Sequence, residues 1–152
     1  MNETLIVDGF QAAGVAAGLK KNGKKDLGLI FSTVPAAVAG VFTRNRIQAA
    51  PVVLGRQRLQ TGKGRAIVVN SGNANCFTGR QGMVDANTMC TLVADRLNIE
   101  AHEVLVASTG VIGTYLMMDK IVPGIELAAS QLSRGGHLDA EMAIMTTDTR
   151  PK

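Results

Sequence analysis

Aromatic side chains are scarce in this chain of 152 residues, which has no tryptophan, one tyrosine and four phenylalanines. Seventeen glycines and a hydrophobic fraction of 46% accompany that scarcity, so we expect a core of small aliphatic side chains in closely packed layers. So few rings give little support to nucleic-acid binding, although the net charge is +4. We interpret the basic clusters at residues 20–25 and 44–65 as a solvated face, with steering of a small anionic substrate as the alternative.

Cysteines and long apolar runs are also few. Cys76 and Cys90 cannot form a disulfide framework or a metal cluster, and we expect two reduced, partly buried thiols. The apolar runs, such as residues 36–42, are far shorter than a membrane span. The first residues lack the basic and apolar regions of a signal peptide. We therefore predict a cytoplasmic location and no membrane partner.

The usual catalytic motifs are absent as well. The sequence contains no His-Glu-x-x-His, no Gly-x-Ser-x-Gly and no phosphate-binding glycine loop. His102 lies in a charged segment and His137 follows two glycines, and neither has a neighbouring nucleophile motif, so we assign both to surface roles. The aspartates lie too far apart in the sequence to indicate a metal site, and we predict none.

Hydrophobic patterning predicts an α/β fold in which a glycine-rich sheet and helices form a layered sandwich. In the first half we expect extended segments at 4–7, 12–19, 26–33 and 37–43, with a hairpin turn at Asn22-Gly23 and a connection at Pro35. In the second half helices and strands alternate, which favours layers of both. The expected helices are 51–59, 83–97, 119–132 and 139–145, and the expected strands are 66–70 and 103–108.

Three polar clusters follow apolar segments, at residues 70–75, 108–110 and 146–149. Ligands in layered α/β folds usually lie at the C-terminal ends of strands. If the strands before the first two clusters are neighbours, these clusters meet at one edge of the sheet. The hydroxyls and glycine of residues 108–110 could then hold a developing oxyanion. Turn and cap chemistry explains the same residue types equally well, so spacing alone leaves both interpretations open.

Several motifs resemble the ornithine acetyltransferase family, over essentially the whole chain and in the family's order. They are residues 8–15, 40–45 with 49–52, 70–79, 104–113 and 143–149. One departure is Cys76-Phe77, which stands where the family's motif has a small residue and a cysteine. The resemblance implies the fold of the ornithine acetyltransferases and of the related self-processing aminopeptidases.

The resemblance also implies an enzyme of arginine biosynthesis that moves an acetyl group from N-acetylornithine to glutamate through an acyl-threonine intermediate. The nucleophile is the N-terminal threonine of a β chain cut from the same precursor, and its own amino group serves as the base. By motif, Thr109 and Gly110 match the oxyanion hole, and Thr146 or Thr147 matches a substrate-binding position, while residues 70–75 help to shape the site. No cofactor is implied, although acetyl-CoA is a candidate substrate.

On this resemblance, residues 1–152 form a single α-chain-like domain or fragment that lacks the C-terminal end of α and all of β. The chain ends directly after its threonine cluster and contains no glycine-rich, self-cleaving segment ending in Ala-Thr. The implied partners are the β chain, N-acetylornithine and glutamate, in an α2β2 heterotetramer. Two alternatives remain: part of an N-terminal-nucleophile aminopeptidase or amidase, and a non-enzymatic small-molecule-binding module. We expect the isolated chain to be inactive and to expose apolar surface.

Overall fold

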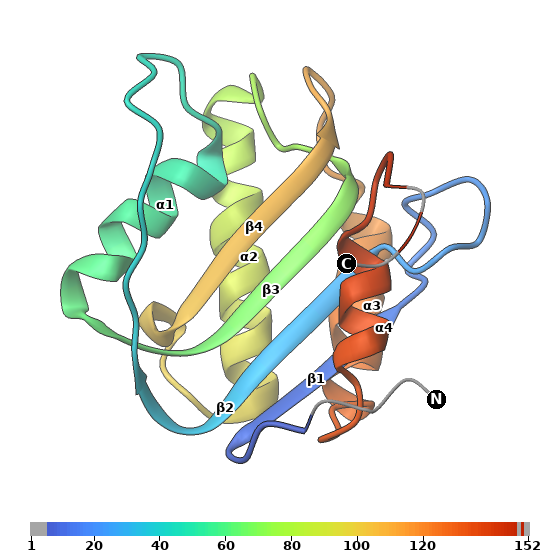
Figure 1. The fold of residues 1–152 in the computed structure, drawn as a ribbon. Helices are drawn as coiled ribbons and strands as arrows, with labels where there is room; N and C mark the ends of the chain where they lie inside the picture. Colours follow the sequence, from blue (N-terminus) through green and yellow to red (C-terminus); the bar gives the residue numbers. More distant parts are fainter. Residues whose placement is uncertain (1–5, 149, 151–152) are drawn as a thin grey trace.

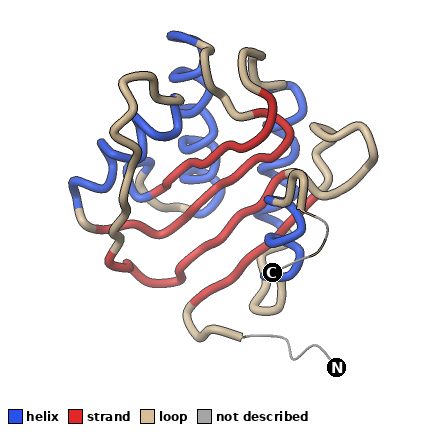
Figure 2. The backbone as a smooth tube through the Cα atoms, turned by 45° about the horizontal axis from the view of Figure 1, so that its top comes forward, coloured by secondary structure: helices blue, strands red, loops and turns tan. Residues whose placement is uncertain are grey.

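In the part of the chain that the structure describes, four strands form a single mixed sheet, in the order in which they occur in the chain. The computed structural model describes residues 6–148 and 150. The sheet is antiparallel from β1 to β2 and from β2 to β3, and parallel from β3 to β4 (Figures 1 and 2). The strands are β1 (Phe10–Val15), β2 (Leu27–Ala37), β3 (Lys63–Asn73) and β4 (Val104–Val111).

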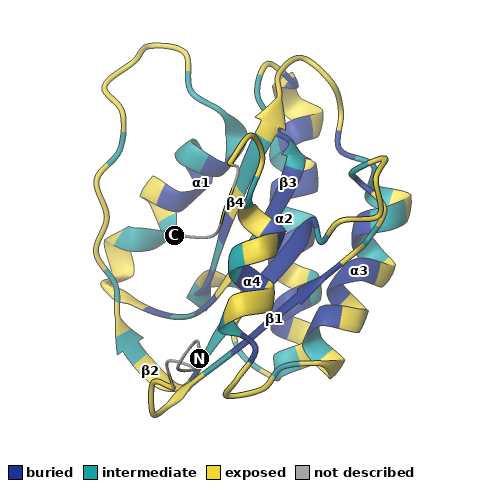
Figure 3. Cartoon of the chain, turned by 45° about the vertical axis from the view of Figure 1, so that its right-hand side comes forward, coloured by how far each residue is buried: buried dark blue, intermediate teal, exposed yellow. Residues whose placement is uncertain are grey.

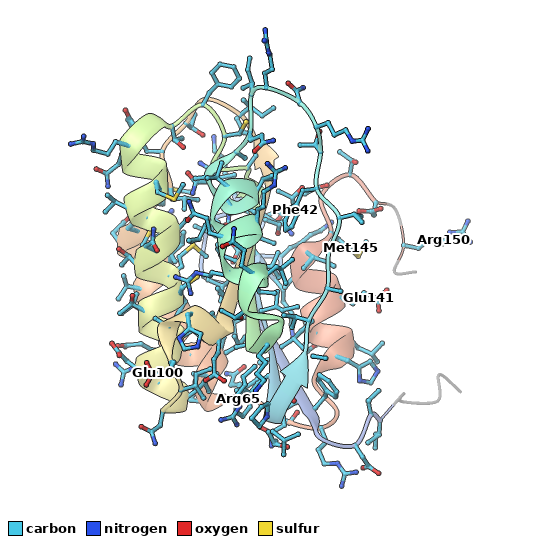
Figure 4. The ribbon with its side chains drawn as sticks, turned by 90° about the vertical axis from the view of Figure 1, so that its left-hand side faces the viewer. Phe42, Arg65, Glu100, Glu141, Met145 and Arg150 are labelled. Carbon is cyan, nitrogen blue, oxygen red and sulfur yellow. The ribbon has the colours of Figure 1, made fainter. Side chains whose placement is uncertain are left out.

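Helices cover the two faces of this sheet unequally. The long helix α2 (Gly79–Leu97) and α3 (Met118–Ser130) lie on one face, and the short α4 (His137–Ile144) lies on the other (Figures 1 and 4). Helix α1 (Ala50–Arg58) packs beside β4 and α2 at one edge of the sheet. Two short 3-10 turns, Leu59–Thr61 and Ala101–Glu103, precede β3 and β4. None of the described helices is both long and apolar enough to cross a membrane.

The hydrophobic core lies between the sheet and the α2–α3 layer. Alternate residues of the strands face it, as the two-residue period of a strand requires, and α2 and α3 present apolar stripes to them. Burial of each large apolar side chain contributes about 1.5–3 kcal/mol, so this layer supplies most of the hydrophobic stabilisation. Its fully buried members include Leu27, Leu29, Val68, Met89, Val93, Val104, Ile121 and Ile125.

Two glycines allow α4 to approach the opposite face closely. Gly14 and Gly28 are register partners across β1 and β2. A Cβ atom on Gly14 would overlap the backbone carbonyl of Asp139, and one on Gly28 would lie 3.1 Å from Val69 Cγ1 and 3.4 Å from the Ala140 carbonyl oxygen. Helix α4 therefore rests on the strand backbone itself. This close contact gives part of the high glycine content a structural reason.

The helices expected from the sequence are confirmed, whereas the first half of the chain differs from expectation. Strand β2 continues through Pro35, with a register irregularity between Phe31 and Ala36, so the strand expected at 37–43 is wrong. Proline is tolerated at such irregularities because no ladder hydrogen bond is required there. Residues 38–49 form a largely exposed loop (Figure 3).

The other differences concern the ends of elements. Residues 16–26 connect β1 to β2 as a long loop that turns at Asn22, so the expected hairpin exists but not as a two-residue turn. Of the strand expected at 4–7, residues 4 and 5 lie outside the described residues, and Ile6 and Val7 belong to no strand. Of the threonine cluster, Thr149 lies outside the described residues.

Candidate active site

The polar ends of β3 and β4 lie side by side. In the parallel register Asn70 pairs with Ser108, Ser71 with Thr109, and Gly72 with Gly110. The expectation that these two strands are neighbours is therefore confirmed. Both strands run further than expected, because residues 71–73 and 109–111 still belong to the sheet. Ser108 and Thr109 thus sit on strand backbone before the register shift at Gly72–Asn73, and this backbone fixes the face that each side chain occupies.

One pair of side chains is directed toward the α2–α3 layer. Asn70 is fully buried, and its side chain donates a hydrogen bond to the Asn73 carbonyl oxygen at 2.9 Å. The Ser108 hydroxyl donates to Asn70 Oδ1 at 2.6 Å. These two side chains tie β3 to β4 from within, since a buried polar group requires a partner. Ser108 is therefore a structural residue rather than a site residue.

Ser71 and Thr109 occupy the opposite face, on the side of α4, because each follows its inward-facing neighbour by one residue. Thr109 is half-buried. Within residues 6–148 and 150, its hydroxyl makes no side-chain hydrogen bond. The Thr109 hydroxyl can therefore donate to a ligand without breaking a bond inside the chain.

Gly110 adopts a backbone conformation that other residues rarely take, with φ of +132°. A Cβ atom at this position would lie 2.6 Å from the Asn73 nitrogen, where the register between β3 and β4 shifts. The position therefore requires glycine. A threonine hydroxyl followed by the amide of such a glycine provides two donors within one residue of each other, which is the arrangement that stabilises an oxyanion.

The asparagines after Asn70 hold the surrounding loops rather than a ligand. Asn73 Nδ2 donates to the carbonyl oxygens of Thr114 at 3.1 Å and Tyr115 at 2.9 Å. Asn75 is buried, and its side chain donates to the Gly82 carbonyl oxygen at 2.8 Å. Residues 70–75 therefore support the edge of the sheet through a buried hydrogen-bond network.

Thr146 and Thr147 follow directly after the C-terminal end of α4, and both are exposed. Two contacts secure this helix end. The Ser71 hydroxyl donates to the Ala143 carbonyl oxygen, and Lys20 Nζ donates to the Met145 carbonyl oxygen at 2.6 Å. Figure 4 shows Met145 at this end of α4, on the side of the sheet opposite α2. Because Ser71 is the register partner of Thr109, the last turn of α4, which the threonine pair follows, lies against the C-terminal end of β3.

The titratable groups near the site are few. Burial lowers the pKa of Lys20, and the Asp26 carboxylate acts in the opposite direction. Burial raises the pKa of the Cys90 thiol to about 11, so this side chain is a neutral part of the core. Cys76 is half-buried, and both thiols are free, as expected. Among the described residues no group of histidine, cysteine, aspartate and glutamate side chains could hold a metal ion.

The two histidines differ in their surroundings. His102 is exposed, which confirms its surface role. His137 is half-buried, and its Nδ1 is buried without a hydrogen-bond partner among the described residues, so a plain surface role is wrong for it. It lines an apolar cavity of about 440 Å³ between α4 and the sheet, together with Phe10, Ile30 and Val69. His137 begins α4, whereas the threonine pair follows its other end.

Three residues of this region escaped sequence reasoning. Lys20 is expected on a solvated basic face, yet its ammonium contacts the end of α4. Asp26 is a fully buried carboxylate, and Ser71 belongs to β3 although the expected strand ends at residue 70. Lys20 and Ser71 find their partners at the end of α4, far along the sequence, and the partners of Asp26 are main-chain amides of a loop without a regular period, so no local pattern reveals them.

Comparisons with known proteins find a matching family model, curated relatives and solved structures. A family model described as the ArgJ family matches residues 11–152. The chain is 55% identical over 141 residues to the arginine biosynthesis bifunctional protein ArgJ of Caldanaerobacter subterraneus subsp. tengcongensis, covering 93% of this chain and 35% of that protein. It is 51% identical over 146 residues to the protein of the same name from Geobacter sulfurreducens, covering 96% of this chain and 37% of that protein. The chain thus spans little more than a third of these curated relatives.

Two solved structures share the fold. A crystal structure of ornithine acetyltransferase complexed with ornithine, from Mycobacterium tuberculosis, superposes with a TM-score of 0.91 at 46% identity, over 95% of this chain and 79% of that chain. An arginine biosynthesis bifunctional protein ArgJ from Bacillus halodurans superposes with a TM-score of 0.89 at 42% identity, over 97% and 79% of the two chains. These superpositions confirm the expected α/β fold.

Proposed function

This chain belongs to the ArgJ family, and we propose that it supplies the oxyanion-binding half of an acetyltransferase of arginine biosynthesis. The complete enzyme moves an acetyl group from N-acetylornithine to glutamate. The observation that carries this proposal is that Thr109, whose hydroxyl no described side chain engages, precedes the glycine-only backbone of Gly110 at the β3–β4 edge. Identities of 55% and 51% to bifunctional proteins of arginine biosynthesis favour this reaction over the aminopeptidase and binding-module alternatives.

The reaction requires a nucleophile from a second chain. In the proposed cycle the N-terminal threonine of the β chain attacks the acetyl carbonyl carbon, and its hydroxyl proton passes to its own amino group. The carbon–nitrogen bond then breaks, the ornithine nitrogen takes up the proton, and an acyl-threonine remains. The neutral amino group of glutamate next attacks this ester, the acyl carbon–oxygen bond breaks, and the proton lost by the nitrogen passes to the threonine oxygen, which forms N-acetylglutamate and restores the threonine.

Each attack turns the acetyl carbonyl oxygen into an oxyanion. We assign its stabilisation to two donors of this chain, the Thr109 hydroxyl and the Gly110 amide. Removal of one such donor typically costs about 3–4 kcal/mol of transition-state stabilisation. The substrate-binding role belongs to Thr146 or Thr147, which are exposed beside the same face of the sheet. No dissociable cofactor takes part, and acetyl-CoA is a candidate second acetyl donor.

The proposed partner of this chain is the β chain of the same precursor, in an α2β2 assembly. Support comes from an apolar sheet patch, formed by Phe10, Ile30, Ile67 and Val69 on the face that carries α4. Phe10, Ile30 and Ile67 are 42%, 37% and 38% exposed, and Ile30 and Ile67 are register partners. Contiguous exposed apolar surface of this kind is typical of interfaces. The cytoplasmic location stays a prediction.

An acetyl-transfer assay on the complex of this chain with a matching β chain tests the proposal. We expect Thr109→Val to lower kcat by about 10²–10³-fold and Thr109→Ser to keep most of the activity, because serine retains the donor. Thr91→Val is the matched control, since Thr91 is an exposed helical threonine bonded only within α2. Unchanged kcat for Thr109→Val contradicts the assigned role, and release of acetate without transfer to glutamate favours the amidase alternative.

A further inference from the structure

The ammonium group of Lys20 joins the β1–β2 loop to the end of α4. Its Nζ donates to the Lys25 carbonyl oxygen at 2.8 Å and to the Met145 carbonyl oxygen at 2.6 Å, and lies 3.5 Å from the Ala143 carbonyl oxygen. Carbonyls at the C-terminal end of a helix lack partners within the helix and carry partial negative charge. A lysine in this position satisfies them and complements that charge.

The loop that carries Lys20 is itself fixed to β3 by Asp26. This carboxylate is fully buried and accepts backbone hydrogen bonds from Ala17 at 2.7 Å, Leu19 at 2.6 Å and Lys20 at 2.9 Å. The backbone carbonyl oxygen of Asp26 accepts a hydrogen bond from the Ser71 amide at 2.8 Å. The main chain of Lys20 is therefore held in place relative to Ser71.

The two residues that hydrogen-bond the end of α4, Ser71 and Lys20, are therefore fixed relative to each other. The Ser71 hydroxyl holds the Ala143 carbonyl, and the Lys20 ammonium holds the Met145 carbonyl, immediately before Thr146. Thr146 and Thr147 are exposed and rest on no strand. These two contacts fix the point at which the threonines leave the helix, and the Asp148 carboxylate accepts a further hydrogen bond from the Thr146 amide at 3.4 Å.

We propose that Lys20 is a positioning residue, which fixes the Thr146–Thr147 pair against the Thr109–Gly110 edge and thereby sets substrate affinity. This inference rests on the proposed function. The Lys20 ammonium already donates its hydrogen bonds to carbonyl oxygens. It therefore acts by holding the end of α4 in place and not by contacting the substrate. Loss of the ammonium releases the threonine pair while leaving the oxyanion donors in place.

The test compares three variants in the complete enzyme assembled with its β chain. Lys20→Met removes the ammonium, Lys20→Arg keeps a cation, and Lys24→Met removes an exposed charge from the same loop without a contact to α4. We expect Lys20→Met to raise KM for N-acetylornithine on the order of tenfold with kcat changed less than about threefold. Lys20→Arg should recover part of the affinity, and Lys24→Met should match the parent enzyme.

Amide hydrogen exchange over residues 141–150 provides a readout that does not depend on activity. We expect faster exchange there in Lys20→Met and not in Lys24→Met. Unchanged KM together with unchanged exchange overturns the inference, even where acetyl transfer itself proceeds normally. If the parent complex transfers no acetyl group, the proposed function fails while exchange still decides whether Lys20 holds the segment. If Lys20→Met does not fold, the same measurements on Lys20→Gln decide the matter.

Discussion

Ser71 and Thr109 are register partners on neighbouring parallel strands, and their side chains lie on the same face of the sheet. Their hydroxyls nevertheless have different uses. The Ser71 hydroxyl donates to the Ala143 carbonyl oxygen, whereas no described side chain engages the Thr109 hydroxyl. This difference separates a residue that anchors α4 from a residue that is free to bind a reacting oxygen, and it leads to the following predictions.

Replacement of Gly110 by alanine should destabilise the protein far more than replacement of Gly113. Both glycines have positive φ, +132° and +85°, but only the Gly110 position would bring a Cβ atom against backbone. We expect Gly113→Ala to lower the free energy of unfolding by about 1–2 kcal/mol through backbone strain alone. Gly110→Ala adds overlap with β3, for a total loss of about 3 kcal/mol or more.

Urea denaturation of the two variants measures this difference. Equal losses for Gly110→Ala and Gly113→Ala would show that β3 gives way to the added methyl group, which contradicts the close strand contact described here.

The stability of the protein should fall in alkaline solution because of Cys90. Burial raises the pKa of this thiol from 9.0 in the unfolded chain to about 11 in the folded protein. A folded pKa above the unfolded one gives a contribution that is complete below pH 9 and is lost as the pH rises toward 11. A shift of about two units corresponds to about 3 kcal/mol in the free energy of unfolding.

Cys90→Ala provides the comparison, since it lacks the thiol that titrates. The difference in free energy of unfolding between the parent and Cys90→Ala should shrink across this pH window. A thiol reagent at neutral pH should modify the half-buried Cys76 and leave Cys90 unmodified until the protein unfolds. Equal labelling of both thiols in the folded protein would be inconsistent with the burial of Cys90.

Replacement of Gly14 or Gly28, which lie under α4, by alanine should displace the helix to different extents. A methyl group on Gly14 would overlap the Asp139 carbonyl, which is backbone and cannot rotate away. A methyl group on Gly28 meets first the end of the Val69 side chain at 3.1 Å, which can shift. We expect Gly14→Ala to lower the free energy of unfolding by about 3 kcal/mol or more and Gly28→Ala by about 1 kcal/mol.

Limited proteolysis within residues 133–148 reports on the same displacement independently of global stability. Cleavage should be fastest in Gly14→Ala and intermediate in Gly28→Ala. Parental resistance in Gly14→Ala would contradict the close seating of the helix.

The apolar sheet patch should make the isolated chain self-associate, because no described element covers it completely. Ile30→Lys combined with Ile67→Lys should yield a monomer in sedimentation velocity and abolish binding to the β chain. Val84→Lys is the control, since Val84 is 50% exposed and lies on α2, which covers the opposite face of the sheet. A parent chain that sediments as a single monomeric species would refute this prediction.

Sequence reasoning succeeded where a signal is local. The apolar spacing along residues 83–97 predicts α2 because one helical face repeats every three or four residues. It failed at Pro35, where a bulge accommodates the proline, since nothing in the neighbouring residues announces a bulge.

The same limit applies to the candidate site. The motif at 108–110 predicts a site at the C-terminal ends of two neighbouring strands, but only the register shows that Ser108 and Thr109 face opposite sides of the sheet. The contacts of Lys20 with Ala143 and Met145 span more than 120 residues of sequence, and no periodicity encodes them. Placement of the threonine pair is therefore a property of the folded chain alone.

Helix α4 meets β1 at Gly14 through main-chain atoms, whereas at Gly28 the nearest atom belongs to the Val69 side chain, so only the contact at Gly14 contains no rotamer that could adjust. The main chain at Gly14 consequently sets how closely the helix packs on the sheet. A relative that carried a larger residue at the position of Gly14 would have to lift the helix, and the threonine pair that follows it would rise as well. One residue without a side chain thus sets how high Thr146 and Thr147 stand above the sheet.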